Sequence, residues 1–217
     1  MENQTEPNRP TGPLANGAQI FSDVFSPLII PTYGMAIAMW LTPLRTIPES
    51  SRLIFTLLIA CITGLIPLVF IIVLMRVGKV ADMDISNRHQ RMAPLMVALI
   101  CYLFASWILQ RAHAPAWLSL FFCGAAIAVA VAGIITPFWK ISAHTTSIGG
   151  LVGLLAWLAV AGIADVNAMA MLTAGILLAG LMGTSRLILR RHTIGQVTAG
   201  FFLGLACTFG LDLLLCS

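Results

Sequence analysis

Long apolar runs separated by short polar stretches dominate the chain. Most of these runs hold about 17 to 25 residues, the length a helix needs to cross roughly 30 Å of hydrocarbon. The seven runs cover residues 21–44, 53–75, 92–109, 116–136, 147–164, 168–184 and 193–215. The pattern predicts an all-α fold, a multi-span helical membrane bundle with six to seven transmembrane helices.

The first run, residues 21–44, is the weakest of the seven. Pro27, Pro31 and Pro43 interrupt it, and proline cannot continue the hydrogen bonds of a helix. The run either crosses the membrane or begins as an interfacial turn and spans only from about Pro31. In the following run, Pro67 predicts a kink.

The amino-terminal stretch differs from the rest in composition. Residues 1–19 are polar and rich in Pro, Asn, Gly and Thr, which predicts a disordered tail. They lack the basic segment, apolar core and cleavage site of a removed signal peptide. Residues 20–217 are expected to form a single integral membrane domain.

Composition excludes several classes of protein. The chain is 59% hydrophobic and 9% charged, which is typical of multi-span membrane proteins and not of soluble domains. The net charge of +4 is small and the arginines lie near the ends of the runs, so no nucleic-acid partner is expected. The five cysteines form no close pair and predict neither a disulfide framework nor a metal site.

Polar loops with basic and histidine side chains recur after every second apolar run. These are the loops with Arg88 and Arg91, with Ser142 and His144, and with Arg186 and His192. Because two crossings separate each loop from the next, all three are predicted on one side of the membrane. Glycines four residues apart (Gly149 and Gly153, Gly200 and Gly204) predict close packing between helices.

The most charged of these loops, residues 185–196, places three arginines and a histidine between two apolar runs. Charge at the edge of a span is costly unless it has a function or reaches water. A histidine that attacks phosphorus needs one neutral ring nitrogen and an acceptor that orients the other. Gln196 would lie over His192 in a helix, and Arg186 offers the planar fork that matches phosphate. The alternative is simple membrane-flanking charge.

The spacing Ser185-Arg186-x5-His192-x3-Gln196 resembles the third signature, Ser-Arg-x5-His-x3-Asp, of the type 2 phosphatidic acid phosphatase and vanadium haloperoxidase superfamily. Gln196 stands where that family has aspartate. The resemblance implies that Ser185 and Arg186 bind phosphate. It also implies that His192 forms a phosphohistidine which water later hydrolyses, with Gln196 as the group that orients it.

A second resemblance lies in Ser142-Ala143-His144, which is similar to the last three positions of the family's Pro-Ser-Gly-His signature. A serine just before an apolar helix is a natural N-cap, and the free N–H groups there attract anions. Ser142 is therefore a candidate phosphate ligand. His144 is a candidate general acid for the departing oxygen, or else a helix-end histidine that faces lipid headgroups.

The family's first signature, Lys-x6-Arg-Pro, is not matched strictly. Arg88 and Arg91 lie three residues apart at the expected place and would share one face of a helix, so both are candidates for phosphate contact. The alternative is again membrane-flanking charge. Lys140 and Lys79 are candidates for the role of the missing lysine.

Together these features predict a metal-independent membrane phosphatase. It would hydrolyse a lipid or polyprenyl phosphate monoester or diphosphate, with substrate and membrane lipids as its partners. The site offers basic groups and no cluster of carboxylates, so no metal or cofactor is expected. The alternative is a catalytically degenerate relative that binds phospholipid headgroups or scaffolds membrane partners. A transporter lacks support, since Asp212 is the only acid within a later run.

The expected location is a bacterial inner membrane. The loops on the motif side and the amino-terminal tail together carry nine of the 12 lysines and arginines, and Arg45, Arg52 and Arg111 lie on the other side. The positive-inside rule then predicts a cytoplasmic site. The excess is smaller, five against three, without the four basic residues Arg88, Arg91, Lys140 and Arg186, which the chemistry would need anyway.

Overall fold

The computed structural model describes residues 10–80 and 88–216, apart from the side chains of Arg88 and His89. Within these ranges the fold is all-α and contains no strand. Six helices there are long and apolar enough to cross a membrane: Glu49–Arg76, Met92–Arg111, Ala116–Ile135, Ala143–Val160, Ala168–Ile188 and Ile194–Cys216. The predicted class is confirmed, and the chain is a multi-pass membrane protein.

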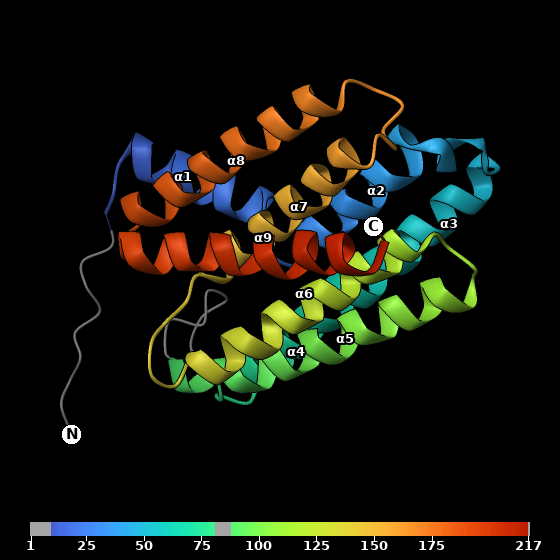
Figure 1. Ribbon diagram of the computed structural model, residues 1–217. Helices are drawn as coiled ribbons and strands as arrows, with labels where there is room; N and C mark the ends of the chain where they lie inside the picture. Colours follow the sequence, from blue (N-terminus) through green and yellow to red (C-terminus); the bar gives the residue numbers. More distant parts are fainter. Residues whose placement is uncertain (1–9, 81–87, 217) are drawn as a thin grey trace.

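The first apolar run is not one helix. Helix α1 (Pro13–Val24) and helix α2 (Ile30–Leu41) are separated by a turn around Pro27, and a 3₁₀ helix, η1 (Pro43–Thr46), follows. Figure 1 shows α1 and α2 following one another along the bundle. The 12 residues of α2 rise only about 18 Å, so α2 alone is too short to cross a bilayer.

Part of the tail that was expected to be disordered is helical. Residues 13–19 belong to α1, so the prediction of disorder is wrong for them; residues 1–9 lie outside the described residues. Pro13 suits the first helical position, because its missing N–H has no partner there in any helix. Ala15, Ala18 and Ser22 are buried on the face of α1 that packs on α8, and this packing outweighs the unfavourable local composition.

The next span is a single long helix with an irregular middle. It consists of α3 (Glu49–Ala60), a π-helical turn η2 (Cys61–Leu65) and α4 (Ile66–Arg76). Pro67 cannot donate a backbone hydrogen bond to the preceding turn, and a wider turn relieves that mismatch. The π-helical turn ends two residues before Pro67, where the sequence predicts a kink.

The remaining spans are regular. Helices α5 (Met92–Arg111) and α6 (Ala116–Ile135) form an antiparallel hairpin. They are followed by α7 (Ala143–Val160), α8 (Ala168–Ile188) and α9 (Ile194–Cys216) (Figure 1). Outward-facing leucines and isoleucines such as Leu57 and Ile134 are 68% and 71% exposed, as expected for side chains that contact lipid.

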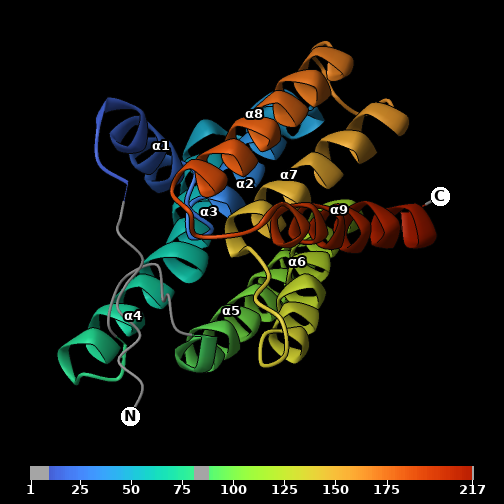
Figure 2. The same ribbon diagram turned by 90° about the vertical axis from the view of Figure 1, so that its left-hand side faces the viewer.

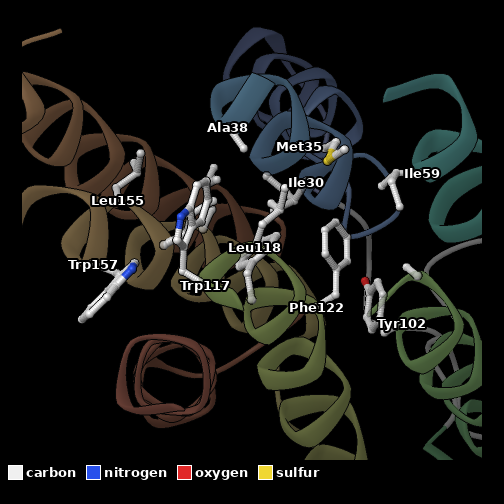
Figure 3. Close-up of a cluster of buried hydrophobic side chains, with 14 of the residues drawn as sticks. Ile30, Met35, Ala38, Ile59, Tyr102, Trp117, Leu118, Phe122, Leu155 and Trp157 are labelled. Atoms are coloured by element: carbon white, nitrogen blue, oxygen red, sulfur yellow. The ribbon is translucent and has the colours of Figure 1, made fainter. Parts of the chain in front are cut away.

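Helix α2 lies within the bundle and its side chains meet those of several spans. Figure 3 shows Met35 of α2 close to Phe122 of α6, with Ile59 of α3 nearby, and all three are almost fully buried. The outer faces of the helices contact lipid hydrocarbon, so both the interior and the surface are shielded from water. Close packing of side chains is therefore what distinguishes the interior from the surface. Helix α2 therefore fills the space between α3, α6 and α7.

Helices α7 and α9 make the closest contact of the bundle, through the predicted glycines. A methyl group at Gly204 would collide with the carbonyl oxygen of Thr146, and one at Gly149 with that of Phe201. A methyl group at Gly200 would lie 2.8 Å from the carbonyl oxygen of Ser142. The two backbones approach this closely only because these residues lack side chains, which confirms the predicted packing.

At the opposite end of the bundle, an ion pair and a backbone hydrogen bond join two loops. Arg45 in η1 and Asp165, between α7 and α8, form an ion pair with Nε and Oδ2 2.9 Å apart. The backbone N–H of Asp165 donates to the carbonyl of Leu41 at 3.0 Å. These contacts show that the loops after α2 and after α7 share one end, as the alternation of spans requires.

Candidate functional site

Direct hydrogen bonds join the three loops that sequence places on one side. Arg91, at the start of α5, donates from Nη1 to the carbonyl of Ile141 at 3.1 Å. The backbone N–H of Ser142 donates to the carbonyl of Gln196 in α9 at 3.4 Å. The predicted common side is confirmed, and the candidate residues lie at the end of the bundle that faces the viewer in Figure 2.

The six-residue step from Arg186 to His192 has a structural reason. Helix α8 ends in a Schellman motif, in which the N–H of Arg191 donates to the carbonyl of Arg186 at 3.1 Å and that of Arg190 to Leu187 at 2.9 Å. Arg190 has φ of 50°, in the left-handed region. The motif reverses the chain within two residues and brings His192 back beside the last turn of α8, where Arg186 lies.

The contact between His192 and Gln196 is present, but a helical turn does not create it. His192 lies before α9, which begins at Ile194. Gln196 Oε1 lies 3.2 Å from His192 Nδ1 and accepts from the N–H of Thr193 at 3.2 Å, while the N–H of Gln196 donates to Thr193 Oγ1 at 3.4 Å. Thr193 and Gln196 thus form a capping box, and the Thr-x-x-Gln spacing is the signal in the sequence that predicts it.

This geometry determines the tautomer of His192. Because a backbone N–H donates to the side chain of Gln196, the atom at that position must be the amide oxygen. An oxygen accepts, so in the neutral ring Nδ1 carries the proton and donates to Gln196. The lone pair is then on Nε2, the nitrogen that a nucleophile would use.

The surroundings keep His192 neutral. Its side chain is 8% exposed. Burial, followed by the positive charges of Arg91, Lys140 and Arg186, lowers the pKa of His192 from 6.5 to about 2, while the hydrogen bond with Gln196 opposes this change. The imidazole is therefore uncharged at pH 7, and three cations surround it.

Two of those cations are themselves buried. The side chain of Arg186 is 1% exposed and that of Arg91 is 9% exposed. His144, half-buried in the first turn of α7, lies within electrostatic range of both arginines and forms a hydrogen bond with the backbone of Ser22 in α1. Cations held in the interior need compensating groups, and a bound anion is one such group.

The structure brings some candidate residues to the site in roles other than those expected. Ser142 is fully buried and accepts from the N–H of Thr145, which confirms the predicted N-cap, but its own N–H is bonded to Gln196. The hydroxyl of Ser185 donates to the carbonyl of Leu181 at 2.8 Å. A phosphate contact from Ser185 would therefore require this bond to break, and one from the backbone of Ser142 is blocked.

Of the remaining basic candidates, the structure describes the side chains of Lys140 and Lys79 but only the backbone of Arg88. Lys140 is half-buried and close enough to His192 to affect its charge. Lys79 is exposed just beyond the end of α4. The backbone of Arg88 lies in a 3₁₀ turn before α5, but its side chain lies outside the described residues.

The arrangement can bind an anion and present a nucleophile to it. Arginine and lysine side chains match phosphate oxygens in charge and hydrogen bonding. Among the described residues no group of three or more His, Cys, Asp and Glu side chains could hold a metal ion. The donor set is thus suited to oxyanions.

Comparison with known proteins gives no relative for the chain. No protein-family model matches it, and neither a curated protein nor a solved structure shows a significant match.

Proposed function

We propose that the protein is a membrane phosphatase that hydrolyses a lipid or polyprenyl phosphate monoester or diphosphate through a phosphohistidine, without a metal ion. The proposal includes membership of the type 2 phosphatidic acid phosphatase superfamily as a divergent member. It also includes location in a bacterial inner membrane, with the site on the cytoplasmic side as the distribution of basic residues favours.

The single observation that carries the proposal is the state of His192. A buried, neutral imidazole has its Nδ1 proton directed at Gln196 Oε1, and the charges of Arg91, Lys140 and Arg186 act on the same ring. A structural histidine does not need three cations, whereas a nucleophile that attacks a phosphate dianion does.

In the first step, the lone pair of Nε2 attacks phosphorus and the bond to the leaving oxygen breaks. His144, whose protonated form the bound phosphate dianion favours, gives its proton to that oxygen, so the product leaves as an alcohol or a phosphate. The ring of His192 gains positive charge, which the carbonyl of Gln196 stabilises through Nδ1. In the second step, water attacks the phosphorus while His144 accepts its proton. The bond between phosphorus and Nε2 breaks, the electron pair returns to the ring of His192, and inorganic phosphate is released.

The decisive experiment is phosphate release by purified protein in lipid nanodiscs from a panel of lipid phosphates. Wild-type protein is expected to release phosphate, and His192→Ala none above background. His113→Ala is the matched control, because His113 lies in the loop between α5 and α6 at the opposite end. Equal turnover by wild type and His192→Ala would exclude the phosphohistidine mechanism.

A second candidate function is binding of phospholipid headgroups without hydrolysis. The capping box favours it, because Gln196 has a structural role at the start of α9 and brings no negative charge to His192. In a serine protease, replacing the carboxylate that orients the catalytic histidine by an amide lowers the rate about 10⁴-fold. A protein that releases no phosphate but binds lipid phosphates in an Arg186-dependent manner would have this function.

A further inference from the structure

A large groove opens between α1 and the span formed by α3, η2 and α4. Its volume is about 1240 Å³, and His144 and Arg191 are among the residues that line it. Figure 2 shows α1 and α4 on the same flank of the bundle. The groove thus connects the candidate site with the side of the bundle that faces the bilayer.

The wall on the side of α4 is apolar. Its lining residues run from Ala60 through Leu68 and Ile71 to Met75. At 1.5 Å per residue, this wall extends for about 22 Å, most of the roughly 30 Å depth of the hydrocarbon layer. It therefore offers a surface along which a hydrocarbon chain can lie while its phosphate is at the end of the groove lined by His144 and Arg191.

The wall on the side of α1 is polar, although it faces the same groove. Asn16, Gln19 and Asp23 line it, and their spacing of three and four residues puts them on one face of the helix. Gln19 Nε2 donates to Asp23 Oδ1 at 2.8 Å, which holds the carboxylate in place. An ionised carboxylate only accepts hydrogen bonds, so this face attracts donors.

Asp23 and His144 line the same groove. Asp23 follows Ser22, and the backbone of Ser22 is bonded to His144. A ligand phosphate at the basic end of the site would therefore have a carboxylate nearby along α1. That charge disfavours a second phosphate and favours a hydroxyl or ammonium group.

Resting on the proposed function, we propose that the Asn16–Gln19–Asp23 face of α1 selects lipid phosphates that carry a hydroxyl or ammonium group next to the phosphate. Their hydrocarbon chain would lie against α4. Lysophosphatidic acids and sphingoid base phosphates have such a donor. Polyprenyl phosphates and diphosphates do not, because their hydrocarbon begins directly at the phosphate ester.

The test compares two ligands that differ in this donor. Binding of octadecenoyl lysophosphatidic acid and of octadecyl phosphate is measured in nanodiscs, in a His192→Ala background so that neither is consumed. Asp23→Leu removes the acceptors. Glu49→Leu makes the matching change at the exposed start of α3, at the other end of the bundle.

Lysophosphatidic acid is expected to bind at least 10-fold more tightly than octadecyl phosphate, since a hydrogen bond to a charged group has about this effect. Asp23→Leu should abolish the preference, and Glu49→Leu should leave it unchanged. Equal binding of the two lipids, or a preference that survives Asp23→Leu, would overturn the inference. If the preference behaves as expected while wild-type protein releases no phosphate, the inference stands and only the phosphatase proposal fails.

Discussion

The pairing of His192 with Gln196 allows a quantitative test of the electrostatics of the site. Gln196→Glu keeps the length of the side chain, so it preserves both the capping box and the contact with Nδ1 at 3.2 Å. It adds a negative charge about 4 Å from the ring, worth about 4 kcal/mol at an effective dielectric constant of 20. The pKa of His192 should then rise by about three pH units. Aspartate is one methylene shorter and would not reach both partners without backbone movement.

The assay is an NMR titration of protein with isotopically labelled histidine rings. The His192 signals, assigned by their loss in His192→Gln, should remain those of a neutral ring down to pH 4 in the wild type. In Gln196→Glu the ring should take up a proton between about pH 6 and 4. Gln196→Met is the control for side-chain length without an acceptor, and its ring should also stay neutral.

Turnover gives a second readout of the same change. If His192 is the nucleophile, a carboxylate that stabilises the forming imidazolium should raise the rate of phosphate release above that of the wild type. The electrostatic reasoning is refuted if wild-type His192 titrates near pH 6.5, or if Gln196→Glu leaves its titration unchanged.

Three further predictions concern stability in detergent. Because the folded pKa of His192 is below its ordinary value of 6.5, the unfolded chain binds the extra proton first. The midpoint of thermal unfolding should therefore fall as the pH is lowered from about 6.5 toward 4, and less so in His192→Gln; the same slope in both proteins would contradict this. Arg190→Gly should stabilise the fold by about 1 kcal/mol in chemical unfolding, because Arg190 occupies a left-handed conformation, whereas Arg191→Gly should not. Asp212→Leu should raise the unfolding midpoint, since both carboxylate oxygens of Asp212 are buried and lack a hydrogen-bond partner among the described residues, and a lower midpoint would disprove this.

Features with a local or periodic cause could be predicted from the sequence. The spans follow from the lengths of the apolar runs, the common side of the three loops follows from counting crossings, and Ser142 caps α7 because of its place before an apolar helix. The four-residue spacing also predicts the contact of His192 with Gln196, although through a helical turn that the chain does not form.

Features that depend on tertiary packing could not be predicted. Residues 13–19 have the composition of a disordered tail, and they are helical because Ala15, Ala18 and Ser22 meet α8. The groove between α1 and α4 depends on the same placement of α1. In the sequence Asp212 is only an acid near the end of a span, and its complete burial follows from the packing of α9. The two resemblances to the phosphatase signatures identify candidate site residues, but they do not describe these contacts.

The glycine contacts of α7 and α9 have a mechanical consequence for the site. His144 lies in the first turn of α7, and His192 lies two residues before the start of α9. Backbones in direct contact at Gly200 and Gly204 cannot slide or separate without losing that contact along its whole length. We therefore expect the two histidines to keep their relative positions, and in the proposed function widening the groove to admit or release a lipid would fall to α1 and α4. In the proposed phosphatase, ligand exchange would thus be mechanically separate from the alignment of His144 and His192.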